Sequence, residues 1–268
     1  MSFTVDKVTD GRFEMAYLRF GSGKKTMVIL PGLSIQSVLP AAAAIEKQYE
    51  IFSDAFTVYL FDRRTDLPPV YTVENMADDT AAAMRALGLT DCCVFGASQG
   101  GMIAMTIAAK YPALVSRLAL GSTAARMDED NTAVIDEWVS LAEKKDREGL
   151  CLSFGEAVYP PAMFQQYRSA FLAMAKTVTD ADLQRFITLA GSTGSFDMTE
   201  GLTQIPCPVF AIGDTDDRVL GKDATLTIAA LLKDKPDFTL MMYEGYGHAV
   251  YDAAPDYTQR LYDFFQQA

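Results

Sequence analysis

The chain has 268 residues, with 23 lysines and arginines against 35 aspartates and glutamates, and its formal net charge is −12 at pH 7. This length is enough for one large domain, or for a compact domain with an inserted subdomain. Half of the residues are hydrophobic and 22% are charged, so we expect a folded globular protein. Since an acidic surface repels phosphate groups and anionic lipid, we expect no binding to nucleic acid or to membranes.

Cysteine and histidine usage argues against a metal centre. The four cysteines form no C-x-x-C pair, and His248 is the only histidine, so we expect no zinc site. No apolar run approaches the roughly 18 residues of a membrane helix, and no basic start precedes an apolar core, so we expect no signal peptide. Reduced, packed thiols are typical of a cytoplasmic protein, which is the location we expect. These cysteines are Cys92, Cys93, Cys151 and Cys207.

Short apolar strands alternate with helices along the first half of the chain. The first twenty residues have the pattern of a hairpin, with period-two alternation from residue 13 to 20. The later apolar runs are continuous, which predicts strands covered on both faces by helices. Strand followed by helix at this spacing predicts an α/β fold with a doubly wound, mostly parallel sheet. The expected strands are 13–20, 27–30, 56–61, 92–95 and 117–120, and the expected helices are 41–49, 73–87 and 101–110.

Helix follows helix between residues 123 and 194, and no convincing strand interrupts them. We interpret residues 123–194 as a helical cap, or lid, inserted in a core formed by residues 1–122 and 195–268. The helices expected in the cap are 131–147, 151–158, 162–177 and 180–189. Strands resume at 208–212 and 238–243, and an amphipathic helix with Tyr257, Leu261, Phe264 and Phe265 on one side closes the chain.

Residues 96–100, Gly-Ala-Ser-Gln-Gly, form a G-x-S-x-G sequence between an expected strand and an expected helix. So sharp a turn forces its central residue into a strained backbone conformation, and it holds the side chain at the carboxyl edge of the sheet. Gly96 and Gly100 let the neighbouring backbone pass closely. An ordinary glycine-rich turn would have the same letters, but the strand and the helix on either side favour Ser98 as a nucleophile at a helix N-terminus.

A serine hydroxyl needs a base within hydrogen-bond reach. A lone histidine is often structural, but His248 lies in a glycine-rich loop after the last expected strand. This loop should open at the same sheet edge as the serine, so we predict that His248 is the general base. The imidazole in turn needs a carboxylate. Three candidates follow the strand that ends at residue 212, namely Asp214, Asp216 and Asp217.

The order serine, aspartate, histidine is the order of α/β-hydrolases, and three motifs carry the resemblance. They are Gly-Ala-Ser-Gln-Gly-Gly at 96–101, Asp-Asp-Arg-Val at 216–219 and Gly-Tyr-Gly-His at 245–248. From residue 13 to 265 the chain resembles the α/β-hydrolase fold superfamily, in its group of serine esterases, C–C hydrolases and bromoperoxidase-like proteins. In similar proteins the acid commonly precedes a variable residue and then Val or Ile, which favours Asp217. A G-x-x-D spacing would select Asp216, and Asp214 lies close to the strand end.

The resemblance also implies an oxyanion hole of two backbone N–H groups. One is the N–H of Gln99, directly after the serine, and the family takes the other from the loop after the third strand, here at Leu33. The chain departs from the family at two places. Pro31-Gly32 stands where a His-Gly pair is frequent, and residues 62–66, Asp-Arg-Arg-Thr-Asp, lack the usual glycines after the aspartate-arginine step.

We therefore expect a serine hydrolase that cleaves a small carboxylic ester, a thioester or a related carbonyl compound through an acyl-enzyme. The alternatives are a carbon–carbon bond hydrolase or lyase on the same triad, and a non-enzymatic protein of this fold that binds a small ligand. The serine at the elbow disfavours the haloalkane dehalogenases and epoxide hydrolases, which use aspartate there. Neither a P-loop nor a G-x-G-x-x-G sequence is present, so we expect no cofactor.

Apolar residues at helical spacing mark one of the expected cap helices. Packing of the cap onto the core is the simpler interpretation of this stripe, and an apolar acyl pocket is the alternative; Trp138 could serve either purpose. The stripe consists of Ala162, Met163, Phe164, Tyr167, Phe171 and Met174. Arg126, Arg168 and Arg185 are candidate anchors for a substrate carboxylate, although each would by default be solvated surface.

Overall fold

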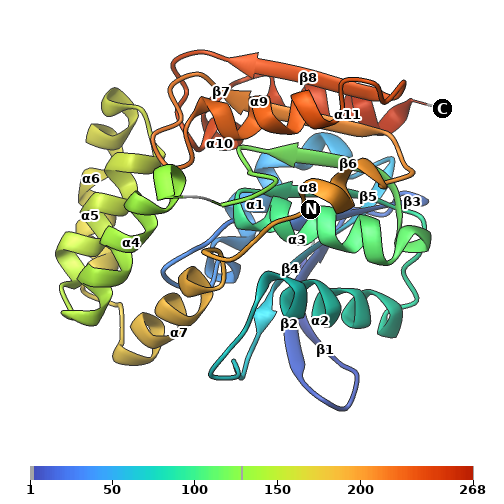
Figure 1. Cartoon of the computed structure of the whole chain (residues 1–268). Helices are drawn as coiled ribbons and strands as arrows, with labels where there is room; N and C mark the ends of the chain where they lie inside the picture. Colours follow the sequence, from blue (N-terminus) through green and yellow to red (C-terminus); the bar gives the residue numbers. More distant parts are fainter. Residues whose placement is uncertain (1–2, 128, 268) are drawn as a thin grey trace.

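One eight-stranded sheet runs through the core of the computed structural model, which describes residues 3–127 and 129–267 (Figure 1). The order across the sheet is β1-β2-β4-β3-β5-β6-β7-β8. Strand β2 pairs antiparallel with β1 and with β4, and the other neighbours are parallel. The predicted N-terminal hairpin and the mostly parallel sheet are therefore confirmed. The strands are β1 (Thr4–Thr9), β2 (Glu14–Phe20), β3 (Lys25–Leu30), β4 (Phe56–Arg64), β5 (Cys92–Ala97), β6 (Val115–Gly121), β7 (Val209–Asp214) and β8 (Phe238–Tyr243).

Helices cover both faces of this sheet. Val28 and Leu30 of β3 belong to the hydrophobic cluster that contains α2, α3 and α9. Met27 and Ile29 belong to a second cluster, on the opposite face, with α1 and α11. This is the alternation that a strand buried on both sides must have, and it confirms the doubly wound α/β fold. The covering helices are α1 (Ala42–Gln48), α2 (Val73–Ala86), α3 (Gln99–Lys110), α9 (Lys222–Leu231) and α11 (Tyr257–Gln266).

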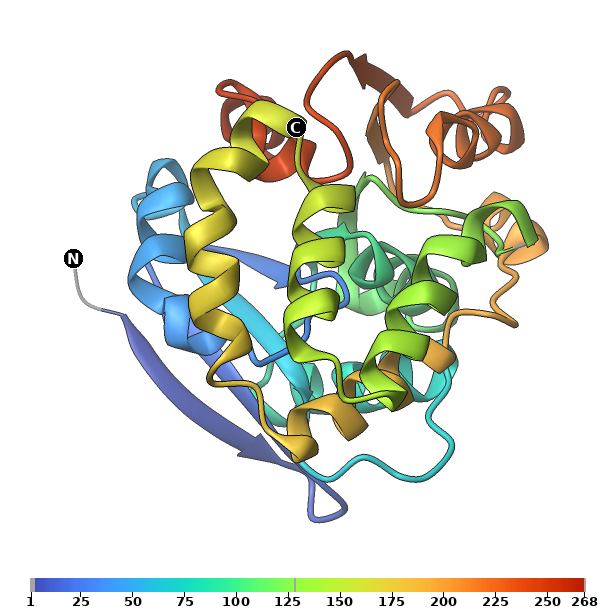
Figure 2. The ribbon, with the colours of Figure 1, turned by 90° about the vertical axis from the view of Figure 1, so that its left-hand side faces the viewer.

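Four helices between β6 and β7 stand at one end of the sheet, and Figure 2 shows them from that side, in front of the core. They are α4 (Glu129–Glu143), α5 (Arg147–Val158), α6 (Pro161–Ala175) and α7 (Asp180–Gly191). The predicted boundary between the first two was wrong, because α5 begins at Arg147 and not at Cys151. Asp146 is the reason: its side chain accepts a hydrogen bond of 2.8 Å from the N–H of Gly149 and starts a new helix.

The two connections between these four helices and the sheet lie side by side. The N–H of Met127 donates to the carbonyl of Phe196 at 2.9 Å, and the N–H of Met198 donates to the carbonyl of Ala125 at 2.7 Å. Between these bonds, Arg126 and Asp197 form an isolated antiparallel bridge. The chain that forms α4 to α7, called the helical segment below, therefore leaves the core and returns to it at one place.

Several short helices complete the described part of the chain. They are α8 (Thr199–Thr203), α10 (Val250–Ala253) and the 3-10 helices Leu39–Ala41, Glu50–Phe52 and Pro112–Leu114. None of the helices within residues 3–127 and 129–267 combines the length and the apolar character that a membrane span requires.

Candidate active site

Ser98 lies at the turn between β5 and α3, with φ 51° and ψ −124°. A side-chain-bearing residue rarely adopts positive φ, and the surrounding contacts must hold it there. Its N–H donates to the carbonyl of Gly121 at 2.8 Å, and its carbonyl accepts a bond of 2.7 Å from Oγ1 of Thr123. These hydrogen bonds, one with the last residue of β6 and one with a residue just after it, hold the strained turn that the G-x-S-x-G sequence predicts.

Two glycines allow this turn to pack tightly. A Cβ at Gly96 would lie 2.3 Å from the carbonyl oxygen of Gly100, and a Cβ at Gly100 would lie 2.0 Å from the carbonyl oxygen of Leu30. Neither distance is compatible with a side chain. The close approach predicted for both positions is therefore present.

His248 contacts Asp217 in a buried pair after β8 and β7. Its Nδ1 lies 2.9 Å from Oδ2 and 3.0 Å from Oδ1 of Asp217, and the two residues are only 3% and 8% exposed. The same carboxylate accepts hydrogen bonds from the N–H groups of Val219, at 2.8 Å, and Leu220, at 3.0 Å. Asp216 is exposed. Of the two aspartates left open by the sequence, Asp217 is the one in contact with the imidazole.

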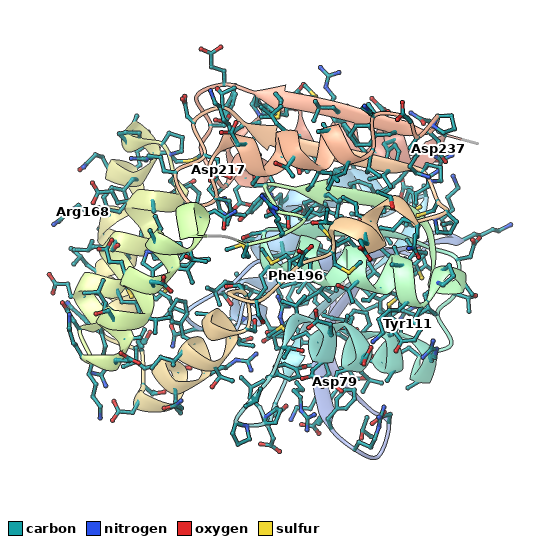
Figure 3. The ribbon with its side chains drawn as sticks, viewed as in Figure 1. Asp79, Tyr111, Arg168, Phe196, Asp217 and Asp237 are labelled. Atoms are coloured by element: carbon teal, nitrogen blue, oxygen red, sulfur yellow. The ribbon has the colours of Figure 1, made fainter. Side chains whose placement is uncertain are left out.

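The electrostatics of this pair favour an ionised carboxylate. Burial raises the pKa of Asp217, but the contact with His248 and the two amide hydrogen bonds outweigh burial and leave the pKa below its usual value. A carboxylate beside Nδ1 favours the tautomer with the proton on that nitrogen. In that tautomer, Nε2 of His248 carries no proton. In Figure 3, Asp217 lies where the core meets the helices α4 to α6.

Asp214 has a positioning role that the sequence did not reveal. It is the last residue of β7 and is 1% exposed. Its Oδ1 accepts from the N–H of Asp216 at 2.7 Å, and its Oδ2 accepts from the N–H of Tyr246 at 2.9 Å. One buried carboxylate thus joins the loop of Asp217 to the loop of His248. The signal that could have found it is an acidic residue at the end of a wholly apolar strand.

The loop after β3 passes directly beside Ser98. A Cβ at Gly32 would lie 3.1 Å from Cβ and 3.8 Å from Oγ of Ser98. The N–H groups of Leu33 and Gln99 donate to no acceptor among the described residues, and both residues line the same cavity as Ser98. These two amides are therefore available to a bound ligand.

Arg63 supports this region from the end of β4. Its Nη2 donates to the carbonyl of Pro31 at 2.7 Å and to Oε1 of Gln99 at 3.1 Å, and the residue is 5% exposed. Burial lowers the pKa of Arg63 to about 10. From Gln99, Nε2 continues the chain of hydrogen bonds to the carbonyl of Leu189, at 2.7 Å, and to Oγ of Ser192, at 3.2 Å. The segment that departs from the family pattern thus connects the Pro31 loop with the end of α7.

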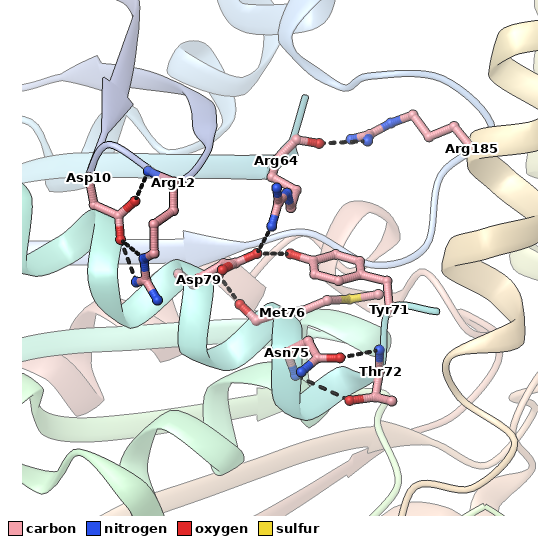
Figure 4. A network of polar contacts seen from close by, with 10 residues as sticks. Asp10, Arg12, Arg64, Tyr71, Thr72, Asn75, Met76, Asp79 and Arg185 are labelled. Atoms are coloured by element: carbon pink, nitrogen blue, oxygen red, sulfur yellow. Dashed lines mark hydrogen bonds and ion pairs between the residues drawn. The ribbon is translucent and has the colours of Figure 1, made fainter. Parts of the chain in front are cut away.

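The neighbouring arginines take other partners (Figure 4). Arg64 pairs with Asp79 at 3.2 Å. Arg185 of α7 donates to the carbonyl of Arg64 and to Oδ1 of Asp62, each at 3.1 Å. Arg185 is therefore committed to the protein and is not available to a substrate carboxylate.

The remaining candidate anchors lie outside the site. Arg126 and Arg168 are exposed, and Figure 3 shows Arg168 at the outer edge of the helical segment. Neither of them lines the cavity at Ser98.

Ser98 and His248 line one cavity of about 990 Å³ between the helical segment and the sheet edge. Of the predicted apolar stripe, Tyr167, Phe171 and Met174 line it, as does Trp138. Phe164 is buried and packs against Phe171 in a tilted arrangement, with ring centroids 6.1 Å apart. Some members of the stripe therefore face the cavity while others pack within the helical segment, and the role of the first group as an acyl pocket stays a prediction.

The cysteines lie away from this chemistry. All four are free and buried, and none of them lines the cavity. Within residues 3–127 and 129–267, no group of three or more His, Cys, Asp or Glu side chains could hold a metal ion.

Comparison with known proteins agrees with the fold described above. A family model described as "Alpha/beta hydrolase family" matches residues 27–259. The Agrobacterium fabrum protein named "Putative carbamate hydrolase RutD" is 25% identical, with 100% of this chain and 99% of that protein covered.

Two solved structures show the same fold along the chain. MGS-M2, an alpha/beta hydrolase enzyme from a Medee basin deep-sea metagenome library, has a TM-score of 0.86 at 20% identity, with 98% of each chain covered. A thermophilic esterase from Thermogutta terrifontis has a TM-score of 0.78 at 22% identity, with the same coverage. At these identities the structures establish the fold alone. Because the family model spans most of its length, the chain belongs to the alpha/beta hydrolase family and is an enzyme with hydrolase activity.

Proposed function

We propose that this hydrolase is a serine enzyme that cleaves a carboxylic ester, a thioester or a related carbonyl compound. Ser98 is the nucleophile, His248 the general base and Asp217 the residue that orients the imidazole. One observation carries the proposal: Nδ1 of His248 is held 2.9 Å from a buried carboxylate, in the cavity that the strained Ser98 also lines.

The reaction proceeds in two steps through an acyl-enzyme. Oγ of Ser98 attacks the carbonyl carbon while Nε2 of His248 takes the hydroxyl proton, and the carboxylate of Asp217 stabilises the imidazolium. The negative oxygen of the tetrahedral intermediate accepts hydrogen bonds from the N–H groups of Leu33 and Gln99. When this intermediate collapses, His248 gives its proton to the departing alcohol or thiol. Water then attacks the acyl group with the same base and releases the acid.

The cavity favours a substrate larger than the one named in the relatives. Their printed name is "Putative carbamate hydrolase RutD", and a free carbamate is a very small anion. A cavity of about 990 Å³ with largely apolar walls and no lysine or arginine lining suits a larger ester with apolar groups. We propose that residues 123–194 act as the cap over a core of residues 1–122 and 195–268, since Trp138, Phe171 and Met174 supply part of the wall. Four free, buried thiols support our proposal of a cytoplasmic location.

The test combines turnover with covalent labelling. We expect the wild type to hydrolyse p-nitrophenyl butyrate and to react with a fluorophosphonate, and we expect Ser98→Ala to lose both. Equal labelling of the variant would contradict the assignment of Ser98. A labelled wild type that cleaves a vinylogous diketone and no ester would point to the carbon–carbon hydrolase. A stoichiometric burst without a second turnover would point to the binding protein.

A further inference from the structure

The charged side chains that line the cavity are acidic. Among the described lining residues there is no lysine or arginine, and the carboxylates are those of Asp182 and Asp252. A substrate carboxylate or phosphate would therefore meet negative charge and find no cationic partner. The lining disfavours anions and leaves neutral or cationic substrates.

Asp182 is already compensated by the protein. Its Oδ2 accepts hydrogen bonds from Gln36, at 3.1 Å, and from the N–H and the hydroxyl of Thr179, at 2.8 Å each. Burial raises the pKa of Asp182, but these bonds and the charge of Arg185 outweigh it and lower the pKa. This carboxylate serves the start of α7, so it has little need of a further partner.

Asp252 has no such compensation. It lies in α10, four residues after His248, and makes no ion pair among the described residues. Its carboxylate accepts bonds only from neutral groups: Nε2 of Gln48 at 3.0 Å and the hydroxyl of Tyr159 at 3.1 Å. Water can reach this side chain from the cavity that it lines. The residue is exposed to water, but partial desolvation beside the cavity wall still raises the pKa of Asp252, because no cation of the described chain lies near it and the two hydrogen bonds do not outweigh the desolvation.

Three tyrosines interact electrostatically with the same carboxylate. Tyr49, Tyr159 and Tyr251 line the cavity with Asp252, and the charge of Asp252 raises the pKa of each of them further, after burial itself. These tyrosines therefore stay neutral near pH 7. A carboxylate without an ion pair attracts a positive charge by direct electrostatics, and neutral tyrosine rings in the same cavity wall add the attraction of their quadrupoles.

We propose that Asp252, together with Tyr49, Tyr159 and Tyr251, binds an ammonium group of the substrate, so that the enzyme prefers esters of amino alcohols or of amino acids over uncharged esters of the same shape. This inference rests on the proposed function, because the group is recognised in the cavity where Ser98 attacks. An ammonium group gives Asp252 the counter-charge that the protein does not provide. Its alkyl groups suit a cavity wall that contains tyrosine rings.

The first experiment compares matched substrates on the wild type. Butyrylthiocholine is paired with its carbon isostere, in which a quaternary carbon replaces the nitrogen. A second pair places the same change on the acyl side, as p-nitrophenyl trimethylammoniobutanoate and its isostere. We expect kcat/KM to favour the cation by about 10-fold in at least one pair. A ratio of one or less in both pairs would overturn the inference, while hydrolysis of the uncharged esters would leave the proposed function intact.

Two variants test whether Asp252 causes the preference for the cationic ester. Asp252→Asn keeps the shape of the side chain and is expected to bring the cation-to-isostere ratio close to one. The control is Asp263→Asn, which removes the same charge from an exposed position outside the cavity and should retain the wild-type ratio. Equal ratios in the wild type and in Asp252→Asn would show that this carboxylate does not recognise the cation.

Binding without turnover separates this inference from the proposed function. Calorimetric titration of Ser98→Ala with butyrylthiocholine and with its isostere measures affinity alone. We expect the cation to bind about 10-fold more tightly. If no ester is turned over by the wild type but this difference persists, the proposed function fails and the cation site stands. Equal affinities would reject the cation site whatever the outcome of the activity assays.

Discussion

The guanidinium of Arg63 donates a hydrogen bond of 3.1 Å to the side chain of Gln99, the residue whose N–H is one of the two proposed oxyanion donors. The same nitrogen of Arg63 bonds the carbonyl of Pro31, two residues before the other donor, Leu33. One buried cation therefore links both halves of the proposed oxyanion hole. Such a link fixes donor geometry before the substrate arrives, which is what stabilisation of a developing charge requires.

Loss of this link should slow the chemical step. We expect Arg63→Met to lower kcat for p-nitrophenyl butyrate by about 10-fold with little change in KM, since displaced donors stabilise the transition state less than a preorganised pair. The control is Arg64→Met, which removes the adjacent arginine and its pair with Asp79 and should leave kcat within about 2-fold. A parallel loss in both variants would indicate a general effect on folding.

Replacement of the proposed triad acid tests the choice between two neighbouring aspartates, Asp216 and Asp217. Asp217→Asn removes the acceptor that fixes the imidazole tautomer, so kcat should fall by about 10⁴-fold. Asp216→Asn changes an exposed side chain and should keep kcat within about 3-fold. The measurement is kcat for one ester with each variant. A larger loss of kcat in Asp216→Asn than in Asp217→Asn would assign the role to Asp216.

Asp252 should reduce the stability of the fold at neutral pH. Its pKa is raised in the folded protein above the usual value of 3.8, so the folded chain binds this proton more tightly than the unfolded chain does. The free energy of unfolding therefore falls as the pH rises from that value through the raised pKa. We expect Asp252→Asn to raise Tm only slightly at pH 7, because water screens the exposed carboxylate, and we expect the gain to shrink as the pH is lowered toward about 4. A gain that does not depend on pH would have a cause other than this charge.

The buried thiols should be unreactive in the native protein. Burial raises the pKa of Cys92 to about 12 and those of Cys151 and Cys207 to about 11, and burial likewise raises the pKa of Cys93. Little thiolate is then present at pH 8, and a disulfide reagent such as Ellman's should react more than about 100-fold more slowly than with a free thiol. All four should react once urea unfolds the chain. Rapid native labelling of any one of them would contradict the burial.

Truncation of a cavity-lining ring should change the preferred chain length. Phe171 lines the cavity and packs against α5, where a Cβ at Gly155 would lie 2.5 Å from its ring. We expect Phe171→Ala to raise kcat/KM for long acyl esters relative to p-nitrophenyl acetate by about 5-fold, at a cost in stability of about 2 kcal/mol. A series of p-nitrophenyl esters of increasing length measures the shift. An unchanged profile would mean that the acyl group binds elsewhere in the cavity.

The sequence was most informative where local chemistry determines local structure. The continuous apolar run before Ser98 predicts a buried strand. The flanking glycines predict a tight turn, in which the neighbouring backbone leaves no room for a side chain. The position of His248 after the last strand likewise predicts its side of the sheet. These inferences hold because the carboxyl ends of parallel strands meet at one edge.

The parts that could not be predicted depend on partners distant in the chain. Asp214 and Arg63 look like surface residues in a linear sequence, and their importance appears only when Tyr246 and Gln99 lie beside them. The helices α8, α9 and α10 were missed for a similar reason, since packing on the sheet stabilises short helices more than their own periodicity does. No local signal separates Arg185, which is half-buried against Asp62, from the exposed Arg168.

The antiparallel bridge between Arg126 and Asp197 marks a place where the helices α4 to α7 could be removed or exchanged. The backbone bonds that flank this contact bring the ends of a long excursion to neighbouring positions. A short turn that joins Arg126 to Asp197 would replace the helices α4 to α7 without distorting the sheet. A helical segment from another protein could also be inserted there if its two ends are similarly close together. Chimeras made at this junction would exchange part of the cavity wall, while the proposed catalytic residues Ser98, Asp217 and His248 stay on the retained core.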